Sequence, residues 1–322
     1  MRRVLYLSHA TPEMYAILRS GVPSGYELVT LGSDSDDERR HRLADCEVAI
    51  VAAYPFRRDL IDAAPRLRLV HHQGVGYHDT LDAAALRARG ISIALTPEGT
   101  TVGVAEHTVL LLLAVLKRLP FADAELRQGR FHINALRPVS RELAGMSIGY
   151  LGMGRIAQAA AERLRAFGTT GIYHDPNVGL PTERASALGV RAASFDELLG
   201  SADVVSLHLP LTPSTRHLIG RETIARMRPG AFLINTARGG LVDEAALVEA
   251  LVTGRLAGAG LDVFETEPLP AGHPLARLPN VVLTPHISAG TRDALATKIR
   301  AIFDNIERFY SGEPLLNEVL DR

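Results

Sequence analysis

The chain has 322 residues, 47% hydrophobic and 22% charged, and its 35 lysines and arginines nearly balance its 36 aspartates and glutamates. This length is typical of two domains, and a net charge of −1 argues against a nucleic acid partner, which calls for a basic face. The longest apolar run, residues 109–116, falls short of the ~20 residues that cross a bilayer. The N-terminus lacks the apolar length of a signal peptide, and Cys46 is the only cysteine, so we expect a cytoplasmic protein without disulfides.

Strand and helix patterns alternate over the first hundred residues. Strands are expected at 4–8, 27–31, 48–52 and 67–71, and helices at 13–19 and 81–89. Strands separated by helices predict parallel βαβ units. The charged run at 33–42 is expected to be a solvated loop or helix face.

A long apolar helix is expected over residues 100–119, with Thr100 or Thr101 as its N-cap and Pro120 just past its end. Residues 120–145 have weak periodicity, which favours an arm or an interface element. A second βα series follows, and its last segment, 291–309, is expected to be an amphipathic helix. The expected strands of this series lie at 146–151, 171–174, 202–207, 231–236, 258–263 and 280–283, and two of its helices at 155–167 and 243–253.

A glycine-rich loop lies between an expected strand and an expected helix, where Gly152-x-Gly154-x-x-Ala157 occurs. Its first glycine permits a tight turn, its second lets the backbone approach a pyrophosphate, and the small third residue lets the helix pack on the strand. Asp175 ends the next expected strand. A carboxylate there accepts the ribose hydroxyls of NAD and repels the 2′-phosphate of NADP, so we expect NAD. The alternative for Asp175 is a turn residue before Pro176.

Three polar residues each follow an expected strand: Arg238, Glu267 and His286. Ligands of an open parallel sheet bind beyond the carboxyl ends of its strands, so these side chains are expected to converge. A histidine passes protons near neutral pH, a carboxylate orients it, and an arginine binds a substrate carboxylate. Taken singly, each residue has a simpler interpretation. Arg238 fits a helix-capping or surface-paired arginine, Glu267 an exposed loop carboxylate before Pro268, and His286 an ordinary loop histidine.

Two other groups of residues are candidate sites. His71, His72 and His78 lie near Asp79 in sequence, but no full ligand set completes a metal site, so no metal is expected. The glycines within residues 73–77 put backbone N–H groups at a strand end, which is a candidate anion-binding turn. No nucleophile-elbow pattern is present, which argues against a serine hydrolase.

Four stretches of the chain resemble the D-isomer-specific 2-hydroxyacid dehydrogenase family. They are GVGYHDTLD at 74–82, GYLGMGRIAQ at 149–158, MRPGAFLINTARGGLVDEAALVEAL at 227–251, and GAGLDVFETEP through LTPHISAGT within 258–291. The resemblance implies an α/β fold of two Rossmann-like, doubly wound parallel-sheet domains. The NAD domain, 100–289, would be inserted into a discontinuous substrate domain of 1–99 plus 290–322.

The resemblance also implies a function and residue roles. It implies a homodimeric NAD-dependent oxidoreductase that interconverts a D-2-hydroxy acid and the 2-oxo acid. His286 would be the general acid/base, Glu267 its partner and Arg238 the substrate-binding arginine, with the backbone at Val75 and Gly76 holding the substrate carboxylate. The implied cofactor residues are Gly152, Gly154, Arg155 and Ile156 at the pyrophosphate, Asp175 at the ribose, Leu209 at the adenosine, and Thr236, Ala237 and Asp262 at the nicotinamide.

Two departures and one alternative accompany this resemblance. The chain has no tryptophan, whereas many relatives carry one in the arm where Phe131 and His132 lie. A regulatory extension after the last helix is not expected, nor is the feedback regulation that goes with it. The alternative function is an NAD(H)-sensing scaffold, like some corepressors of the same fold. We expect neither a flexible tail nor a basic patch, and this argues against the scaffold.

Overall fold

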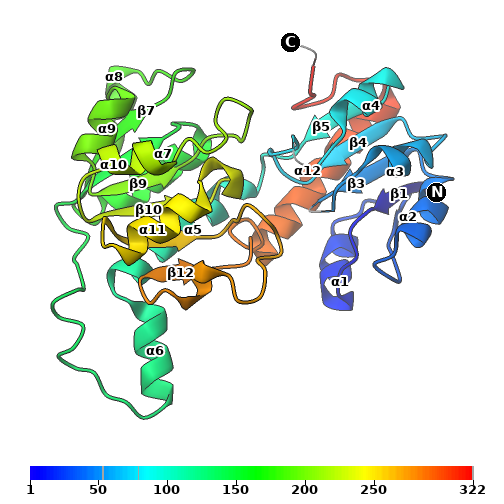
Figure 1. Ribbon diagram of the computed structural model, residues 1–322. Coiled ribbons are helices and arrows are strands. Elements are labelled where there is room, and N and C mark those ends of the chain that lie inside the picture. Colours follow the sequence, from blue (N-terminus) through cyan, green and yellow to red (C-terminus); the bar gives the residue numbers. More distant parts are fainter. Residues whose placement is uncertain (53, 79, 321–322) are drawn as a thin grey trace. The chain divides into compact units, whose positions relative to one another are not determined.

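The chain folds into two compact units. The computed structural model describes residues 1–52, 54–78 and 80–320. Unit 1 consists of Met1–Thr100 and Ala289–Arg322, and unit 2 consists of Thr101–Ser288. Each unit contains a parallel sheet with helices packed on it (Figure 1). The expected α/β class, with two Rossmann-like parallel-sheet domains, is therefore confirmed.

Unit 1 has a five-stranded parallel sheet in the order β2-β1-β3-β4-β5. The strands are mostly apolar along their length, and their side chains alternate between the two faces of the sheet. Both faces of the sheet are therefore apolar. Helices α1 and α12 cover one face, and α2, α3 and α4 cover the other. The strands are β1 (Arg2–Tyr6), β2 (Tyr26–Val29), β3 (Val48–Val51), β4 (Leu69–His72) and β5 (Ser92–Leu95), and the helices are α1 (Pro12–Ser20), α2 (Asp36–Leu43), α3 (Arg58–Asp62), α4 (Ala83–Ala88) and α12 (Arg292–Ser311).

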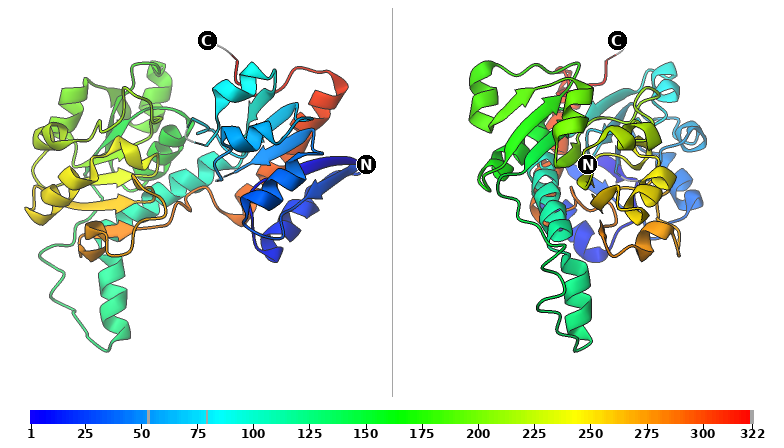
Figure 2. Two further views of the ribbon diagram at one scale, coloured as in Figure 1. Left: turned by 45° about the vertical axis from the view of Figure 1, so that its right-hand side comes forward. Right: turned by 60° about the vertical axis from the view of Figure 1, so that its left-hand side comes forward.

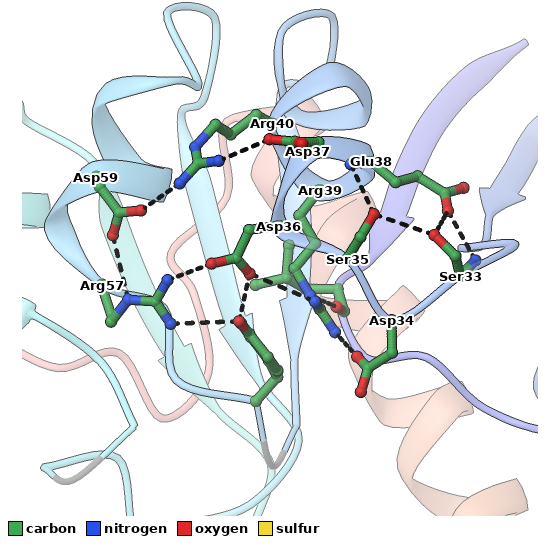
Figure 3. Close-up of polar contacts among 12 residues, drawn as sticks. Ser33, Asp34, Ser35, Asp36, Asp37, Glu38, Arg39, Arg40, Arg57 and Asp59 are labelled. Atoms are coloured by element: carbon green, nitrogen blue, oxygen red, sulfur yellow. Dashed lines mark hydrogen bonds and ion pairs between the residues drawn. The ribbon is translucent and has the colours of Figure 1, made fainter.

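The charged run at 33–42 forms most of α2, and one of its side chains is not solvated. Arg39 is fully buried, against the expectation of an exposed face. Its Nε donates to the Leu7 carbonyl at 3.2 Å, its guanidinium stacks on the Tyr54 ring, and it pairs with Asp34 and Asp36 (Figure 3). A buried guanidinium is tolerated because these partners satisfy its donors and offset its charge.

Unit 2 has a seven-stranded parallel sheet in the order β12-β11-β10-β9-β6-β7-β8. The strand order reverses between β6 and β9, the point where open α/β sheets bind ligands. Helices α5, α7 and α8 pack on one side of this sheet and α9, α10 and α11 on the other. The strands are β6 (Ser147–Leu151), β7 (Thr170–His174), β8 (Val190–Ala192), β9 (Val204–Leu207), β10 (Ala231–Asn235), β11 (Leu256–Leu261) and β12 (Val281–Leu283). The helices are α5 (Thr100–Leu116), α7 (Arg155–Arg165), α8 (Thr182–Leu188), α9 (Phe195–Ser201), α10 (Arg221–Arg226) and α11 (Glu244–Val252), with short 3₁₀ turns η1 (Gly239–Leu241) and η2 (Pro274–Arg277).

The long apolar helix ends earlier than its sequence pattern predicts. α5 stops at Leu116, Arg118 has a left-handed backbone with φ of 53°, and a second helix, α6 (Leu119–Arg127), begins there. Pro120 therefore starts a helix instead of following one, since a proline in the first helical turn loses no hydrogen bond. α6 and the segment after it extend away from the sheet of unit 2 (Figure 2). No helix in the described part of the chain has the length and apolar character needed to cross a membrane.

Candidate functional site

The candidate residues of unit 2 follow six strands of one parallel sheet. Parallel strands end at a common edge, so the loops after them are neighbours. Gly152 follows β6, Asp175 follows β7, and Leu209 comes shortly after β9. The segment 236–238 follows β10, Asp262 follows β11, and His286 comes after β12.

The glycine loop packs tightly on one side and is open on the other. Gly152 has φ of 88°, and a Cβ there would lie 2.5 Å from the His208 carbonyl oxygen and 3.2 Å from the Leu209 nitrogen. No atom would lie within 4 Å of a Cβ on Gly154, the N-cap of α7, and no side chain caps that helix. Ala157 is fully buried and lets α7 pack on the sheet.

The open helix start fits a dinucleotide pyrophosphate. Helix α9 and helix α11 are capped by Ser194 and Asp243, whereas no side chain among the described residues accepts a bond from the first N–H groups of α7. Such a terminus attracts an anion through its N–H groups and its dipole. Arg155 is exposed and Ile156 half-buried in the first turn of this helix.

Asp175 lies beside the glycine loop, at the end of β7. Its Oδ2 accepts the Met153 N–H at 2.8 Å, and its Oδ1 accepts the N–H groups of Asn177 and Val178 at 2.9 and 3.1 Å. Three bonds from backbone hold the carboxylate and leave acceptor capacity for a ribose hydroxyl. The turn-residue and ribose-binding interpretations are thus compatible in this structure.

Asn235, which sequence reasoning missed, shapes the turn that carries Arg238. Its Oδ1 accepts the Ala237 N–H at 3.0 Å, and its Nδ2 donates to the Arg238 carbonyl at 2.9 Å. Thr236 is buried, and its hydroxyl lies 3.1 Å from that of Thr108 on α5. The sequence feature that indicates a role for Asn235 is its position at the end of a strand, just before this turn.

The Arg238 turn packs backbone against backbone on the segment that leads to Glu267. A Cβ on Gly239 would lie 1.8 Å from the carbonyl carbon of Phe264 and 2.4 Å from the Glu265 nitrogen. This approach requires glycine and brings Arg238 close enough to stabilise the charge of Glu267.

His286 and Glu267 form a direct pair. His286 Nδ1 lies 2.7 Å from Glu267 Oε2, while Glu267 Oε1 accepts the Phe264 N–H at 2.9 Å. Burial pushes the pKa of Glu267 up, but its bonds with His286 and Phe264 and the charges of His286 and Arg238 outweigh burial, so this pKa is lowered. Glu267 is therefore a carboxylate at neutral pH, and the side chains of the pair are 35% and 45% exposed, within reach of a ligand.

The loop that carries His286 wraps around Asp262. The buried Asp262 carboxylate accepts the hydroxyl of Thr284 at 2.6 Å and the N–H groups of Ile287 and Ser288 at 3.0 and 2.9 Å. Its carbonyl accepts the His286 N–H at 2.8 Å, which helps hold that residue at φ of 52°. The nicotinamide role implied for Asp262 stays a prediction, because its carboxylate serves this loop.

His107 and Thr284 are further members of this network that sequence reasoning missed. His107 Nε2, from α5, lies 2.9 Å from the Thr284 hydroxyl and 3.5 Å from Asp262 Oδ1. The sequence feature that points to His107 is its place in a largely apolar helix, two residues before the apolar run 109–116. For Thr284 it is the position directly after β12.

The expected anion-binding turn lies in unit 1, after β4. Val75 is 44% exposed, and Gly76 is half-buried. The neighbouring His71 and His72 bond to Thr96 and Thr80, and no metal-binding group of side chains occurs among the described residues. Asp79, the fourth member of that sequence cluster, lies outside the described residues.

Comparison with known proteins decides the family. Residues 109–288 match the family described as "D-isomer specific 2-hydroxyacid dehydrogenase, NAD binding domain". The chain belongs to this family. Its NAD-binding domain lies in unit 2, and NAD is the cofactor for which the glycine loop and Asp175 are suited.

Relatives within the 2-hydroxyacid dehydrogenase family carry several names. D-3-phosphoglycerate dehydrogenase of Methanocaldococcus jannaschii is 39% identical over 285 residues, which are 88% of this chain and 53% of that protein. Glyoxylate reductase of Korarchaeum cryptofilum is 38% identical over 275 residues, 84% of this chain and 82% of that one. NAD-dependent formate dehydrogenase from Staphylococcus aureus, solved in complex with NAD, is 32% identical with a TM-score of 0.85, covering 100% and 99% of the two chains. The chain spans about half the length of the phosphoglycerate dehydrogenases it matches.

Proposed function

We propose that the protein is an NAD-dependent oxidoreductase that interconverts a D-2-hydroxy acid and the corresponding 2-oxo acid. The observation that carries this proposal is the His286–Glu267 pair, 2.7 Å apart, on the sheet edge that also bears the glycine loop and Arg238. The names of the relatives, reductases and dehydrogenases of small oxo and hydroxy acids among them, support it. A cytoplasmic location is proposed with it, since Cys46 is buried and unpaired as in a reducing compartment.

The proposed mechanism assigns one task to each side chain. The planar fork of Arg238 binds the carboxylate of the 2-oxo acid and polarises its carbonyl. Nδ1 of His286 is held by Glu267, so Nε2 is the atom that gives a proton to the carbonyl oxygen during reduction. The reduced nicotinamide, when bound, supplies the hydride. Ionised Glu267 favours the protonated ring until that step and, in the reverse direction, stabilises the ring after it accepts the proton.

NADH oxidation with a panel of 2-oxo acids tests this function. The panel contains glyoxylate, pyruvate, hydroxypyruvate, phosphohydroxypyruvate and bulkier acids, and we expect turnover of at least one with a D-2-hydroxy acid as product. The chain shows no arginine cluster near residues 73–77 in sequence that would bind a phosphate, which favours unphosphorylated acids. NADH binding without turnover of any acid would contradict the enzyme and favour the scaffold alternative.

A Glu267→Gln variant is expected to shift the pH dependence of reduction downward. Reduction needs a proton on His286, and the negative charge of Glu267 helps to hold it there, so without that charge the rate should begin to fall at a lower pH. The kcat–pH profile of the variant against wild type checks this. Glu265→Gln is the matched control, because Glu265 lies on the same segment but pairs with His217. An unmoved profile for Glu267→Gln would contradict the pairing.

We propose that the arm at 120–145 forms a homodimer interface. Leu126, Phe131 and Ile133 are 57%, 76% and 65% exposed, and a gathering of large exposed apolar side chains marks an interaction surface. Light scattering after size exclusion should give a dimer for wild type and a monomer for the double variant Phe131→Asp, Ile133→Asp. Val252→Asp should remain dimeric, because Val252 is 66% exposed on α11 and outside the arm. A wild-type monomer would contradict this interface.

A further inference from the structure

Helix α5 carries His107 against the sheet of unit 2, and the proposed mechanism gives this side chain no task. The side chain is only 10% exposed, within a helix that is largely apolar. A buried polar group is costly unless it is hydrogen-bonded, so a histidine at this position requires partners. Its partners are Thr284, at the start of the loop that carries His286, and Asp262, around which that loop wraps.

The contact follows from the way α5 packs on β11. Two glycines of this strand pack against apolar side chains of α5, which lie 2.7 and 2.9 Å from where a Cβ would stand: Gly258 against Val115 and Gly260 against Leu111. No larger residue would allow the helix to approach so closely. Four residues of helix and two residues of strand each span roughly 6–7 Å. The next step of this series, four residues before Leu111 and two residues after Gly260, places His107 opposite Asp262.

The hydrogen bonds determine which atom carries the proton between His107 and Thr284. The Thr284 hydroxyl has one hydrogen, and its bond to Asp262 Oδ1, at 2.6 Å, has the length typical of a hydroxyl that donates to a carboxylate. The hydroxyl oxygen is left to accept, so His107 Nε2, which lies 2.9 Å away, must carry the hydrogen of that contact. The same Nε2 lies 3.5 Å from Asp262 Oδ1, and an N–H donor therefore faces the buried carboxylate.

The loop that His107 contacts determines where His286 lies. Asp262 holds this loop through the Thr284 hydroxyl and two backbone N–H groups. His286 has a left-handed backbone, with φ of 52°, which is unfavourable for a residue with a Cβ and needs support from its surroundings. Thr284 is the one side-chain donor of the loop to Asp262, and rotation about its Cα–Cβ bond would break that bond. The bond with His107 opposes this rotation.

We propose that His107 is a positioning residue of the reaction. By donating to Thr284 it keeps the hydroxyl directed at Asp262, and Asp262 keeps the loop in the arrangement that presents Nε2 of His286. The inference rests on the proposed function, because it concerns the general acid/base of that reaction. His107 acts through the loop and takes no part in proton transfer. Displacement of a reacting group by about 1 Å can lower a rate about a hundredfold.

Two substitutions of His107 separate hydrogen bonding from packing. His107→Gln keeps an amide N–H at about the reach of the imidazole Nε2, whereas His107→Leu keeps an apolar body without a donor. We expect kcat for reduction to fall by roughly 10–100-fold in His107→Leu and to stay within about threefold of wild type in His107→Gln. KM for the 2-oxo acid should change by less than about threefold in both, because Arg238 binds the acid. Glu106→Gln is the control on the same helix and should leave kcat within about twofold, since Glu106 is 62% exposed and pairs with Arg163.

A double-mutant cycle with Thr284→Val tests the route from His107 to the loop. Valine has the shape of threonine without the hydroxyl, so this variant removes both the acceptor for His107 and one donor to Asp262. Because the two side chains act in series, adding His107→Leu to Thr284→Val should lower kcat by no more than about a further threefold. A combined loss equal to the product of the two single losses would overturn the proposal, as would equal losses in His107→Gln and His107→Leu.

Amide hydrogen exchange of the loop gives a readout that needs no substrate. The N–H groups of Ile287 and Ser288 donate to Asp262, so their exchange should be about tenfold or more faster in His107→Leu than in wild type, and unchanged in His107→Gln. Turnover of no 2-oxo acid by wild type would count against the proposed function, and the exchange of these two amides would then decide whether His107 holds the loop. Exchange at the wild-type rate in His107→Leu would show that it does not. If His107→Leu fails to fold, Thr284→Val takes its place and must show both the faster exchange and the loss of kcat.

Discussion

The His286→Ala variant is expected to lose about 10²–10⁴-fold in kcat for reduction, the usual contribution of a general acid. Alanine removes the ring that Glu267 holds at 2.7 Å and leaves no other group on this loop to protonate the carbonyl oxygen. The loop itself should persist, because its bonds to Asp262 come from Thr284 and from the backbone of Ile287 and Ser288. Steady-state rates at saturating substrate, with NADH binding measured by fluorescence, check both statements.

A control variant and one contrary outcome decide whether the His286→Ala result supports a general acid/base role. His41→Ala, which removes an exposed histidine on α2, should leave kcat within about twofold of wild type, since surface substitutions away from a site are near neutral. If His286→Ala is folded, binds NADH and loses only a few-fold in kcat, the assignment of His286 as general acid/base is wrong.

The second large effect is expected in the glycine loop, where Gly152→Ala and Gly154→Ala should fail in different ways. Gly152 has φ of 88°, and a methyl group on it would lie 2.5 Å from the His208 carbonyl oxygen, so alanine there must displace backbone. We expect a loss of stability of at least about 1–2 kcal/mol from the left-handed backbone alone, together with loss of NADH binding.

Gly154→Ala should leave the melting temperature near that of wild type and still weaken NADH binding about tenfold or more. Apart from its chain neighbours, no described residue has an atom within 4 Å of a methyl group on Gly154, so the folded protein accommodates it. The methyl group would instead occupy the space through which the pyrophosphate approaches the start of α7. Calorimetric NADH titrations with thermal melts of both variants separate the two effects. Unchanged NADH affinity in Gly154→Ala would contradict the proposed pyrophosphate position.

Local sequence patterns were sufficient for the sheet and for the edge that carries the candidate residues. Apolar strands alternating with helices predict parallel order, and parallel order places Asp175, Arg238 and His286 at strand ends on one side. Gly152 and Gly154 were recognisable because a tight turn and an open helix start each require a glycine. Asp243 and Thr291 were recognisable as helix starts, and both side chains accept a bond from the first turn.

Burial of charged side chains could not be predicted in the same way. Arg39 belongs to a charged run, and only the stacking on Tyr54 and the bond to the Leu7 carbonyl explain why it is buried. Lys298 lies in an amphipathic helix, and its place among buried residues is clear only once Asn305 and Phe309 fix how α12 lies on the sheet. Pro120 was expected after a helix and instead begins one, because the left-handed Arg118 ends α5 first.

The sequence by itself therefore determined the fold class, the cofactor loop and which residue types stand at the strand ends, since these depend on periodicity and on neighbours along the chain. Only the tertiary structure decided which atoms pair. Glu267 pairs with His286 because Gly239 lets the turn after Arg238 pack directly on the backbone of the segment that leads to Glu267. The loop of His286 is held in place because its backbone donates hydrogen bonds to the Asp262 carboxylate. Such contacts join residues far apart in the chain, and their distances depend on how loops pack on one another, which no local pattern encodes.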